Sequence, residues 1–129
     1  QQHRQLFIGC RNRMMAVVDA DSGRLKATLP IGSGVDAIAF DPSTELAFSS
    51  NGEGTLTVVH EDSIDKFSVV DSIATQQGAR TMALDTKTHN VFLATAKFGS
   101  TPTPTPGQQS ARPSIVPNTF VILILGAKP

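Results

Sequence analysis

Apolar residues in this chain occur in short, dense runs, and turn-forming residues separate one run from the next. The runs lie at residues 6–10, 14–18, 37–40, 55–59, 91–96 and 120–125. Between them stand segments rich in Gly, Pro, Asp, Asn and Ser, such as 19–23 and 51–54. The 3.6-residue spacing of an amphipathic helix is nearly absent, so the pattern predicts an all-β chain. Because the runs are apolar at successive positions, we expect strands that are covered on both faces.

Three short strand-like segments repeat one another at a nearly constant interval. Leu6, Ala47 and Val91 each begin a run in which Phe is the second residue, at spacings of 41 and 44 residues. A second element, residues 34–41, returns 44 residues later as residues 78–85. A period of about 40–45 residues that contains only strands and turns is typical of β-propeller blades. The repeat therefore predicts four-stranded antiparallel blades that stack side by side around a common axis.

About three blades fit within a single domain that covers residues 1–129. They are expected over residues 4–30, 35–74 and 79–125. Their strands are expected at residues 4–10, 14–19 and 24–30, then 35–41, 46–50, 55–60 and 66–74, then 79–85, 90–97 and 118–125. The first blade lacks its innermost strand and the last blade lacks its outermost strand. We therefore expect the C-terminal part of a larger ring.

A segment rich in Pro and Thr, residues 99–117, interrupts the last blade. Proline cannot donate to a sheet ladder and favours an extended, polyproline-type path. The segment is therefore predicted to be a loop inserted between two strands. Two interpretations stay open: a tolerated surface insertion, or a lid or docking segment over one face of the molecule.

The first repeat unit resembles the YVTN family of β-propellers. Its strand at 6–9 is followed by Ala16-Val17-Val18-Asp19, a turn, and an outer strand that ends in Thr28-Leu29-Pro30-Ile31-Gly32. Phe stands in place of the motif Tyr in all three copies. The motif Asn is present only as Asn51, because Cys10 and Thr95 replace it in the other copies. The resemblance extends over the whole chain outside residues 99–117.

This resemblance implies a seven-bladed ring of the lactonase-like type, exported in bacteria to the periplasm or the extracellular side. At about 42 residues per blade, seven blades need about 290–300 residues, more than twice the 129 present here. An arc of three blades would expose the apolar flank of each terminal blade. We therefore expect the remaining blades of the same protein, or another copy of the chain, to cover these flanks.

The composition limits the classes of function that we expect for this chain. Eleven basic and eleven acidic residues cancel, which disfavours nucleic acid as a partner, although a local basic patch stays open. The longest apolar run, residues 120–125, is far shorter than the about 20 residues that cross a bilayer, so no membrane span is expected. One cysteine and three scattered histidines predict no metal site. No nucleophile motif or phosphate-binding glycine loop is present, so neither a catalytic residue nor a cofactor is predicted.

Candidate binding residues lie in the loops that share one face around the channel of a propeller. They are Arg11, Arg13, Asp36, Asn51, Glu53, Arg80 and Lys97. Asp36 and Arg80 occupy equivalent positions at the start of successive inner strands, so we expect both to point toward the axial channel. Arginine suits ligands whose carboxylate or phosphate is held at two points, which favours Arg11, Arg13 and Arg80. The alternative is that all seven are solvated loop residues.

The leading functional hypothesis is a non-enzymatic binding module or scaffold that holds a protein or a small polar ligand on this loop-bearing face. Two alternatives stay open. An enzyme or redox-enzyme subunit on a lactonase-like propeller would show a cage of Glu, Asp, Asn and His around a metal in the channel. A nucleic-acid-binding propeller would show a contiguous Arg and Lys face and an affinity that falls steeply with salt.

Overall fold

The computed structural model describes residues 4–107 and 112–126, and these residues form ten β-strands and no helix. The strands are β1 (Gln5–Cys10), β2 (Met14–Asp19), β3 (Leu25–Pro30), β4 (Val35–Asp41), β5 (Leu46–Asn51), β6 (Thr55–Ser63), β7 (Lys66–Ala74), β8 (Thr81–Asp85), β9 (Asn90–Thr95) and β10 (Val121–Leu125). The all-β prediction is confirmed. No helix able to cross a membrane occurs in the described part of the chain.

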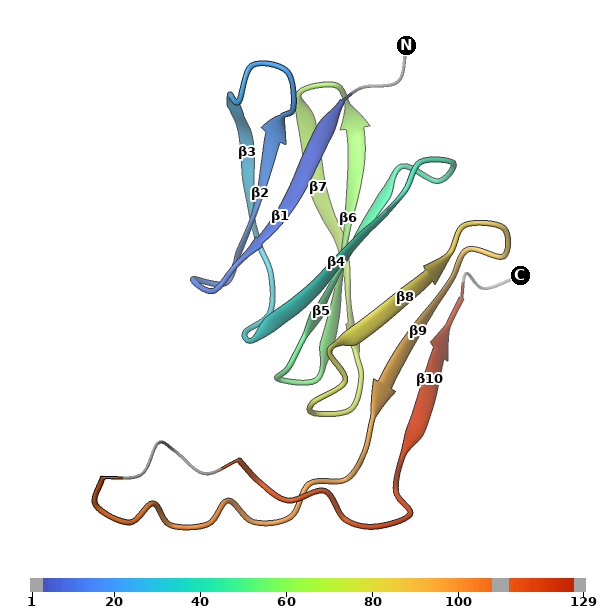
Figure 1. The fold of residues 1–129 in the computed structure, drawn as a ribbon. Coiled ribbons are helices and arrows are strands. Elements are labelled where there is room, and N and C mark those ends of the chain that lie inside the picture. The colour runs from blue at the N-terminus through green and yellow to red at the C-terminus, as the bar shows by residue number, and fades with distance from the viewer. Residues whose placement is uncertain (1–3, 108–111, 127–129) are drawn as a thin grey trace.

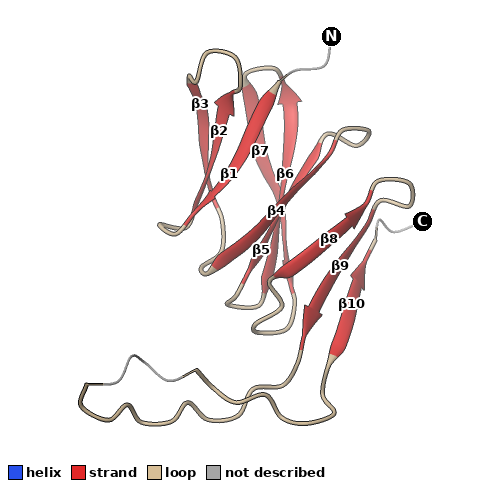
Figure 2. Ribbon diagram, viewed as in Figure 1, coloured by secondary structure: helices blue, strands red, loops and turns tan. Residues whose placement is uncertain are grey.

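The strands form three antiparallel sheets that follow one another along the chain (Figures 1 and 2). The first sheet has the order β1-β2-β3, the central sheet β4-β5-β6-β7 and the third sheet β10-β9-β8. Only neighbours in sequence pair, so each sheet is a meander joined by hairpin connections. The central sheet has the four strands expected of it and the outer two have three each. No sheet closes on itself.

Eight of the ten strands agree with the sequence prediction to within two residues, and the other two differ by three. The predicted strand at 55–60 continues to Ser63, because a register shift between Glu61 and Ser63 lets β6 stay paired with β7 past the expected turn. The predicted strand at 118–125 begins only at Val121. It is preceded by Asn118, which has a φ of 60° and therefore lies outside the extended region of a strand.

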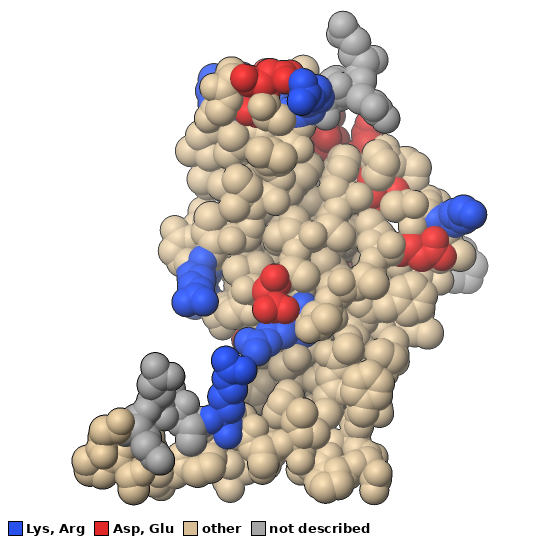
Figure 3. Space-filling view, viewed as in Figure 1, with Lys and Arg blue, Asp and Glu red and all other residues tan. Residues whose placement is uncertain are grey.

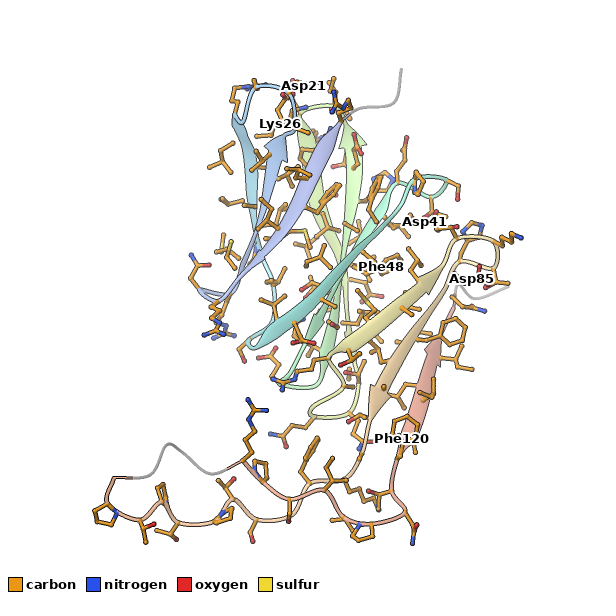
Figure 4. All side chains as sticks on the ribbon, viewed as in Figure 1. Asp21, Lys26, Asp41, Phe48, Asp85 and Phe120 are labelled. Carbon is orange, nitrogen blue, oxygen red and sulfur yellow. The ribbon has the colours of Figure 1, made fainter. Side chains whose placement is uncertain are left out.

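Two apolar layers join the three sheets. The layer between the first and central sheets contains Met15, Val17, Leu29, Ile31, Ala47 and Val59. The layer between the central and third sheets contains Phe48, Leu56, Val58, Ala79, Val91 and Leu93. Successive side chains of a strand point to opposite faces, so the neighbours Ala47 and Phe48 on β5 serve different layers (Figure 4). The central sheet is therefore covered on both faces, as the dense apolar runs predicted.

The outer two sheets are covered on one face only. On β1, Phe7 packs against the first apolar layer, whereas Leu6 is 51% exposed. On β10, Leu123 packs against the second layer, whereas Ile124 is 64% exposed. This exposure is what an arc of three blades predicts for its terminal blades, because each of these two sheets has one neighbouring sheet instead of two.

The connections between strands gather at two ends of the molecule. We call the end formed by residues 11–13, 31–34, 52–54, 75–80, 96–107 and 112–120 the loop-bearing face. The other end, formed by residues 20–24, 42–45, 64–65 and 86–89, is the opposite face. In Figure 1 the loop-bearing face is the lower end of the sheets, and the long segment before β10 extends from it.

Candidate functional site

Main-chain hydrogen bonds join the turns of the loop-bearing face to one another. The amide of Ile31 donates to the carbonyl of Arg13 at 3.0 Å. The amide of Gly52 donates to Gly34 at 2.9 Å, and the amide of Gly78 donates to Gly52 at 2.9 Å. Gly34 and Gly78 have φ values of 72° and 78°, which residues with a side chain rarely adopt. Three sheets thus present their turns at fixed positions relative to one another.

Asn51 and Glu53 are engaged within this face. Asn51 is fully buried, and its amide nitrogen donates to the hydroxyls of Thr55 and Thr57, both at 3.0 Å. The Glu53 carboxylate accepts hydrogen bonds from Ser33 at 2.6 Å and from Thr55 at 3.0 Å. These bonds, that from Ser33 above all, hold the pKa of the Glu53 carboxyl below its usual range. Both residues therefore shape the turn between β5 and β6.

Basic residues predominate on the loop-bearing face (Figure 3). With Asp36, the second residue of β4, the face carries two acidic residues, Asp36 and Glu53. It carries five basic residues, namely Arg11, Arg13, Arg80, Lys97 and Arg112. The difference, 5 − 2, is a charge of +3, and residues 96–120 contain no acidic side chain at all. The net charge of the chain is zero, but this end of the molecule is positively charged.

The opposite face has more acidic than basic residues, and three of its five cations, Arg4, Arg24 and Lys26, are in ion pairs. The strand ends and turns there carry Asp19, Asp21, Asp41, Glu45, Glu61, Asp62, Asp65 and Asp85 against Arg4, Arg24, Lys26, Lys66 and Lys87, a charge of 5 − 8 = −3. Arg4 lies 2.5 Å from Asp21, and Arg24 lies 3.3 Å from Asp65. Within residues 4–107 and 112–126, no carboxylate oxygen lies within 4.0 Å of a cation of the loop-bearing face.

The Pro/Thr-rich insertion is anchored on the loop-bearing face by its two limbs. Phe98 and Ile115 form an antiparallel bridge. Beside it, the amide of Gly99 donates to Ser114 at 2.8 Å and the amide of Val116 donates to Lys97 at 2.9 Å. The Phe98 ring lies against the main chain of Gly78, where a Cβ atom would overlap it.

A hollow of about 660 Å³ lies between these limbs and the turn that precedes β8. Its charged lining residues are Arg80 and Arg112. Its apolar lining includes Phe98, Pro113 and Ile115. Two arginines from distant parts of the sequence, beside an exposed aromatic ring, make this hollow the most chemically distinctive place on the face.

A second hollow, of about 540 Å³, lies beside the free edge of β10. Residues 74–76, at the end of β7, and residues 122–125 of β10 line it. No charged side chain contributes to it. It follows the edge at which a fourth strand would complete the third sheet.

The seven residues predicted from the sequence occupy different parts of the face. Arg80 lines the larger hollow, and Lys97 lies in the limb that bounds it. Arg11 and Arg13 are exposed in the turn between β1 and β2. Asp36 is exposed at a register shift of β4, where the pairing with β5 is interrupted. The described residues form no closed ring, so the expected channel orientation of Asp36 and Arg80 stays a prediction.

Arg112 and Phe98 are the site residues that the sequence analysis missed. Both belong to the insertion or its first limb, which lies outside the repeat that supplied the other candidates. The available signal was that Arg112 is the only charged residue between Lys97 and the end of β10. A single cation in a long segment without acidic residues is a candidate for binding an anion.

A buried carboxylate on the opposite face joins the central and third sheets. Asp41 is fully buried, and its Oδ2 lies 2.6 Å from Nδ1 of His89. Its Oδ1 accepts hydrogen bonds from the amide of Ser43 at 3.1 Å and the Ser43 hydroxyl at 2.8 Å. Burial raises the pKa of Asp41, but the hydrogen bonds from Ser43 and His89 outweigh it and lower the pKa to about 2. This cluster holds two turns together.

Within the described residues, no three His, Cys, Asp or Glu side chains are grouped so that they could hold a metal ion. Comparison of the chain with protein-family models, with curated proteins and with solved structures finds no match. The distinguishing chemistry of the molecule is therefore the charge and shape of its loop-bearing face.

Proposed function

We propose that this chain forms blades of a YVTN-type β-propeller and acts as a non-enzymatic binding module for an anionic ligand or partner. The positive charge of the loop-bearing face carries the proposal. In the described part of the chain no carboxylate lies within 4.0 Å of its five cations, whereas Arg4, Arg24 and Lys26 of the opposite face have such partners. Basic side chains without close partners, on a surface fixed by main-chain hydrogen bonds, attract an anionic partner from solution and orient it.

The stacking of the three sheets supports the propeller part of the proposal. Each junction buries an apolar layer, and the two outer sheets keep apolar side chains such as Ile8 and Ile122 exposed on their free faces, at 43% and 48%. Apolar surface of this kind is suited to further stacked sheets, from the same protein or from another copy of the chain. Export to the periplasm or the extracellular side belongs to the proposal through the family resemblance alone.

A labelled hexaglutamate peptide tests the binding face by fluorescence anisotropy at an ionic strength of about 0.1 M. The variant R11Q/R13Q/R80Q removes three charges from the loop-bearing face. The matched control R4Q/R24Q/K66Q removes three charges from the opposite face. We expect the first variant to weaken binding by about tenfold or more and the control by less than twofold, because electrostatic attraction between exposed charges falls off within about 10 Å in salt.

Equal losses in the two variants would contradict the proposal, since binding would then depend on net charge and not on the face. Absence of binding by the unmodified chain would contradict it as well. A single-stranded oligonucleotide serves as a third arm. If it binds far more tightly than the peptide, and with a steep salt dependence, the nucleic-acid alternative replaces this proposal.

A further inference from the structure

We infer that the hollow between the turn before β8 and the limbs of the insertion is a site for a small organic oxyanion. Arg80 and Arg112 would hold its carboxylate or phosphate group, and Phe98 would contact a planar apolar group next to it. The inference rests on the proposed function, because it names the class of ligand that the loop-bearing face accepts.

The charge in the hollow is the first argument. Arg80 and Arg112 lie 32 positions apart in the sequence and line the same hollow. Within the described residues, neither has a carboxylate within 4.0 Å. Two like charges that face one space repel each other, and an anion between them removes that cost. The forked donors of guanidinium groups match the oxygens of carboxylate and phosphate.

The fixed position of Arg80 is the second argument. Its amide donates to the carbonyl of Gly78 at 3.0 Å, and its own carbonyl accepts a hydrogen bond from the Ser50 hydroxyl. The stem of its side chain passes over Gly52, where an added Cβ atom would lie 3.7 Å from Cδ. A residue held in this way loses little freedom when it binds a ligand.

The apolar wall is the third argument, and it distinguishes an organic ligand from an inorganic ion. Phe98 is 42% exposed and Ile115 is 62% exposed, although both face the hollow. Exposed aromatic and aliphatic side chains beside arginines favour a ligand that combines a planar apolar group with an anion. Such a ligand would bury the exposed part of the Phe98 ring.

The insertion itself is the fourth argument. The equivalent connections of the other two sheets, residues 11–13 and 52–54, are three residues long, whereas the connection between β9 and β10 spans residues 96–120. The long connection supplies Arg112, Pro113 and Ile115 to the hollow. Only this repeat therefore builds such a wall, which favours the docking-segment interpretation of the insertion over a neutral surface loop.

Titration calorimetry or ligand-observed NMR with small probes tests the site. Phenyl phosphate and benzoate combine a ring with an oxyanion, benzamide lacks the charge, and inorganic phosphate lacks the ring. We expect phenyl phosphate or benzoate to bind at least about tenfold more tightly than both benzamide and inorganic phosphate, since charge and apolar contact each contribute. The tighter of the two identifies the oxyanion as phosphate or carboxylate.

Four variants locate the binding. R80Q and R112Q should each weaken phenyl phosphate or benzoate by about tenfold, because each removes a charge-assisted hydrogen bond. K66Q, a change on the opposite face, should leave the affinity within twofold. F98L, which keeps an apolar side chain against Gly78 but removes the ring, should weaken phenyl phosphate and leave inorganic phosphate unchanged. Unchanged thermal unfolding of R80Q and R112Q shows that these variants are folded.

Benzamide binding as tight as benzoate, or full affinity in R112Q, would overturn the inference. The hexaglutamate experiment separates this failure from failure of the proposed function. If the peptide still binds and still requires Arg11, Arg13 and Arg80, while phenyl phosphate and benzoate do not bind, the oxyanion site is wrong and the anionic binding face stands.

Discussion

The two junctions between sheets bury similar apolar layers and differ in what joins them at their edges. At the first junction, Phe7 of β1 stacks on Phe40 of β4 with ring centroids 4.7 Å apart, and meets Phe67 of β7 edge-on at 6.0 Å. Hydrogen bonds cross between sheets at both junctions. At the first, Nζ of the buried Lys26 donates to the carbonyl of Ile64 at 2.8 Å and lies 3.4 Å from the Asp65 carboxylate. At the second junction the buried charged group is an anion. Asp41 pairs with His89 on the opposite face, and Gly78 donates to Gly52 on the loop-bearing face.

The candidate site lies at the second junction. Hydrogen bonds between sheets fix the distance and the angle at each junction. At the second, Gly78 is bound to Gly52, and Arg80 lies two residues after Gly78, so the position of its main chain depends on that bond. The repeat thus provides two stacked interfaces, and the one whose loop-bearing end carries Arg80 holds the binding chemistry.

The largest expected effect tests whether the two apolar layers are equivalent. Met15 in the first layer and Leu93 in the second are both fully buried. We expect M15A and L93A each to lower the free energy of unfolding by about 2–5 kcal/mol, through lost burial and the cavity left behind. V70A, at a side chain 54% exposed on β7, should change it by less than about 0.5 kcal/mol. Urea denaturation measures all three, and a loss in only one of the buried variants would show that the layers differ.

The next effect tests the polar tie of the second junction. Asp41 and Asp85 end equivalent strands, β4 and β8 (Figure 4), but only Asp41 bonds to a residue of another sheet. Asp85 accepts only from its own turn, from the amide of Lys87 and the hydroxyl of Thr88. We expect D41N to cost about 2 kcal/mol of unfolding free energy, because a buried charged acceptor is lost. D85N should cost about 1 kcal/mol or less, and an equal cost would show that the His89 contact adds nothing.

The lowered pKa of Asp41 predicts that the free energy of unfolding depends on pH. The native pKa of Asp41 is about 2, against 3.8 as its ordinary value, so the unfolded chain binds the proton more readily. Its contribution to stability is therefore fully present above pH 3.8 and is lost as the pH falls from there toward 2. Asp19, Asp62 and Asp85 also have lowered pKa values, so they cause a loss of stability at low pH in the unmodified chain and in D41N alike. Unfolding curves between pH 4 and pH 2 should show a shallower loss in D41N, and parallel losses would contradict the assignment.

The sequence predicted the strands well because their signals are local. Each Phe-containing run has turn residues at both ends, and antiparallel neighbours pair through short connections, so repeat and register follow from spacing. The uncovered faces of the first and third sheets followed from the number of blades and not from the strands themselves. Whether Leu6 or Ile124 is buried depends on the presence of a neighbouring sheet, and no residue in the strand itself encodes that neighbour.

The candidate site was predicted in part, and the part that was missed depends on tertiary contacts. Arg80 was found because it stands at a repeated turn. Arg112 reaches the same hollow only because Phe98 packs on Gly78 and Gly99 pairs with Ser114, and such contacts have no local sequence signal. Asn51 was selected as a residue of the face's loops, and its burial follows from partners on β6 that its place in the repeat does not specify.

The smallest effect isolates the contact between the insertion and the second junction. Gly23 and Gly78 have φ values of 70° and 78°, so an alanine at either position incurs a similar backbone cost of about 1 kcal/mol. An added Cβ has nothing within 4 Å at Gly23 but overlaps the Phe98 ring at Gly78. We therefore expect G78A to destabilise the protein by about 1 kcal/mol more than G23A, with the excess due to displacement of the ring.

A double-mutant cycle decides whether that excess belongs to Phe98. In an F98A background the overlap is absent, so G78A should cost only what G23A costs in the unmodified chain. An excess that persists without the ring would place the strain in the main chain at Gly78 and not in the docking of the insertion. The loop-bearing end of the second junction would then be rigid by itself, and the hollow would depend on the insertion only for Arg112 and its apolar wall.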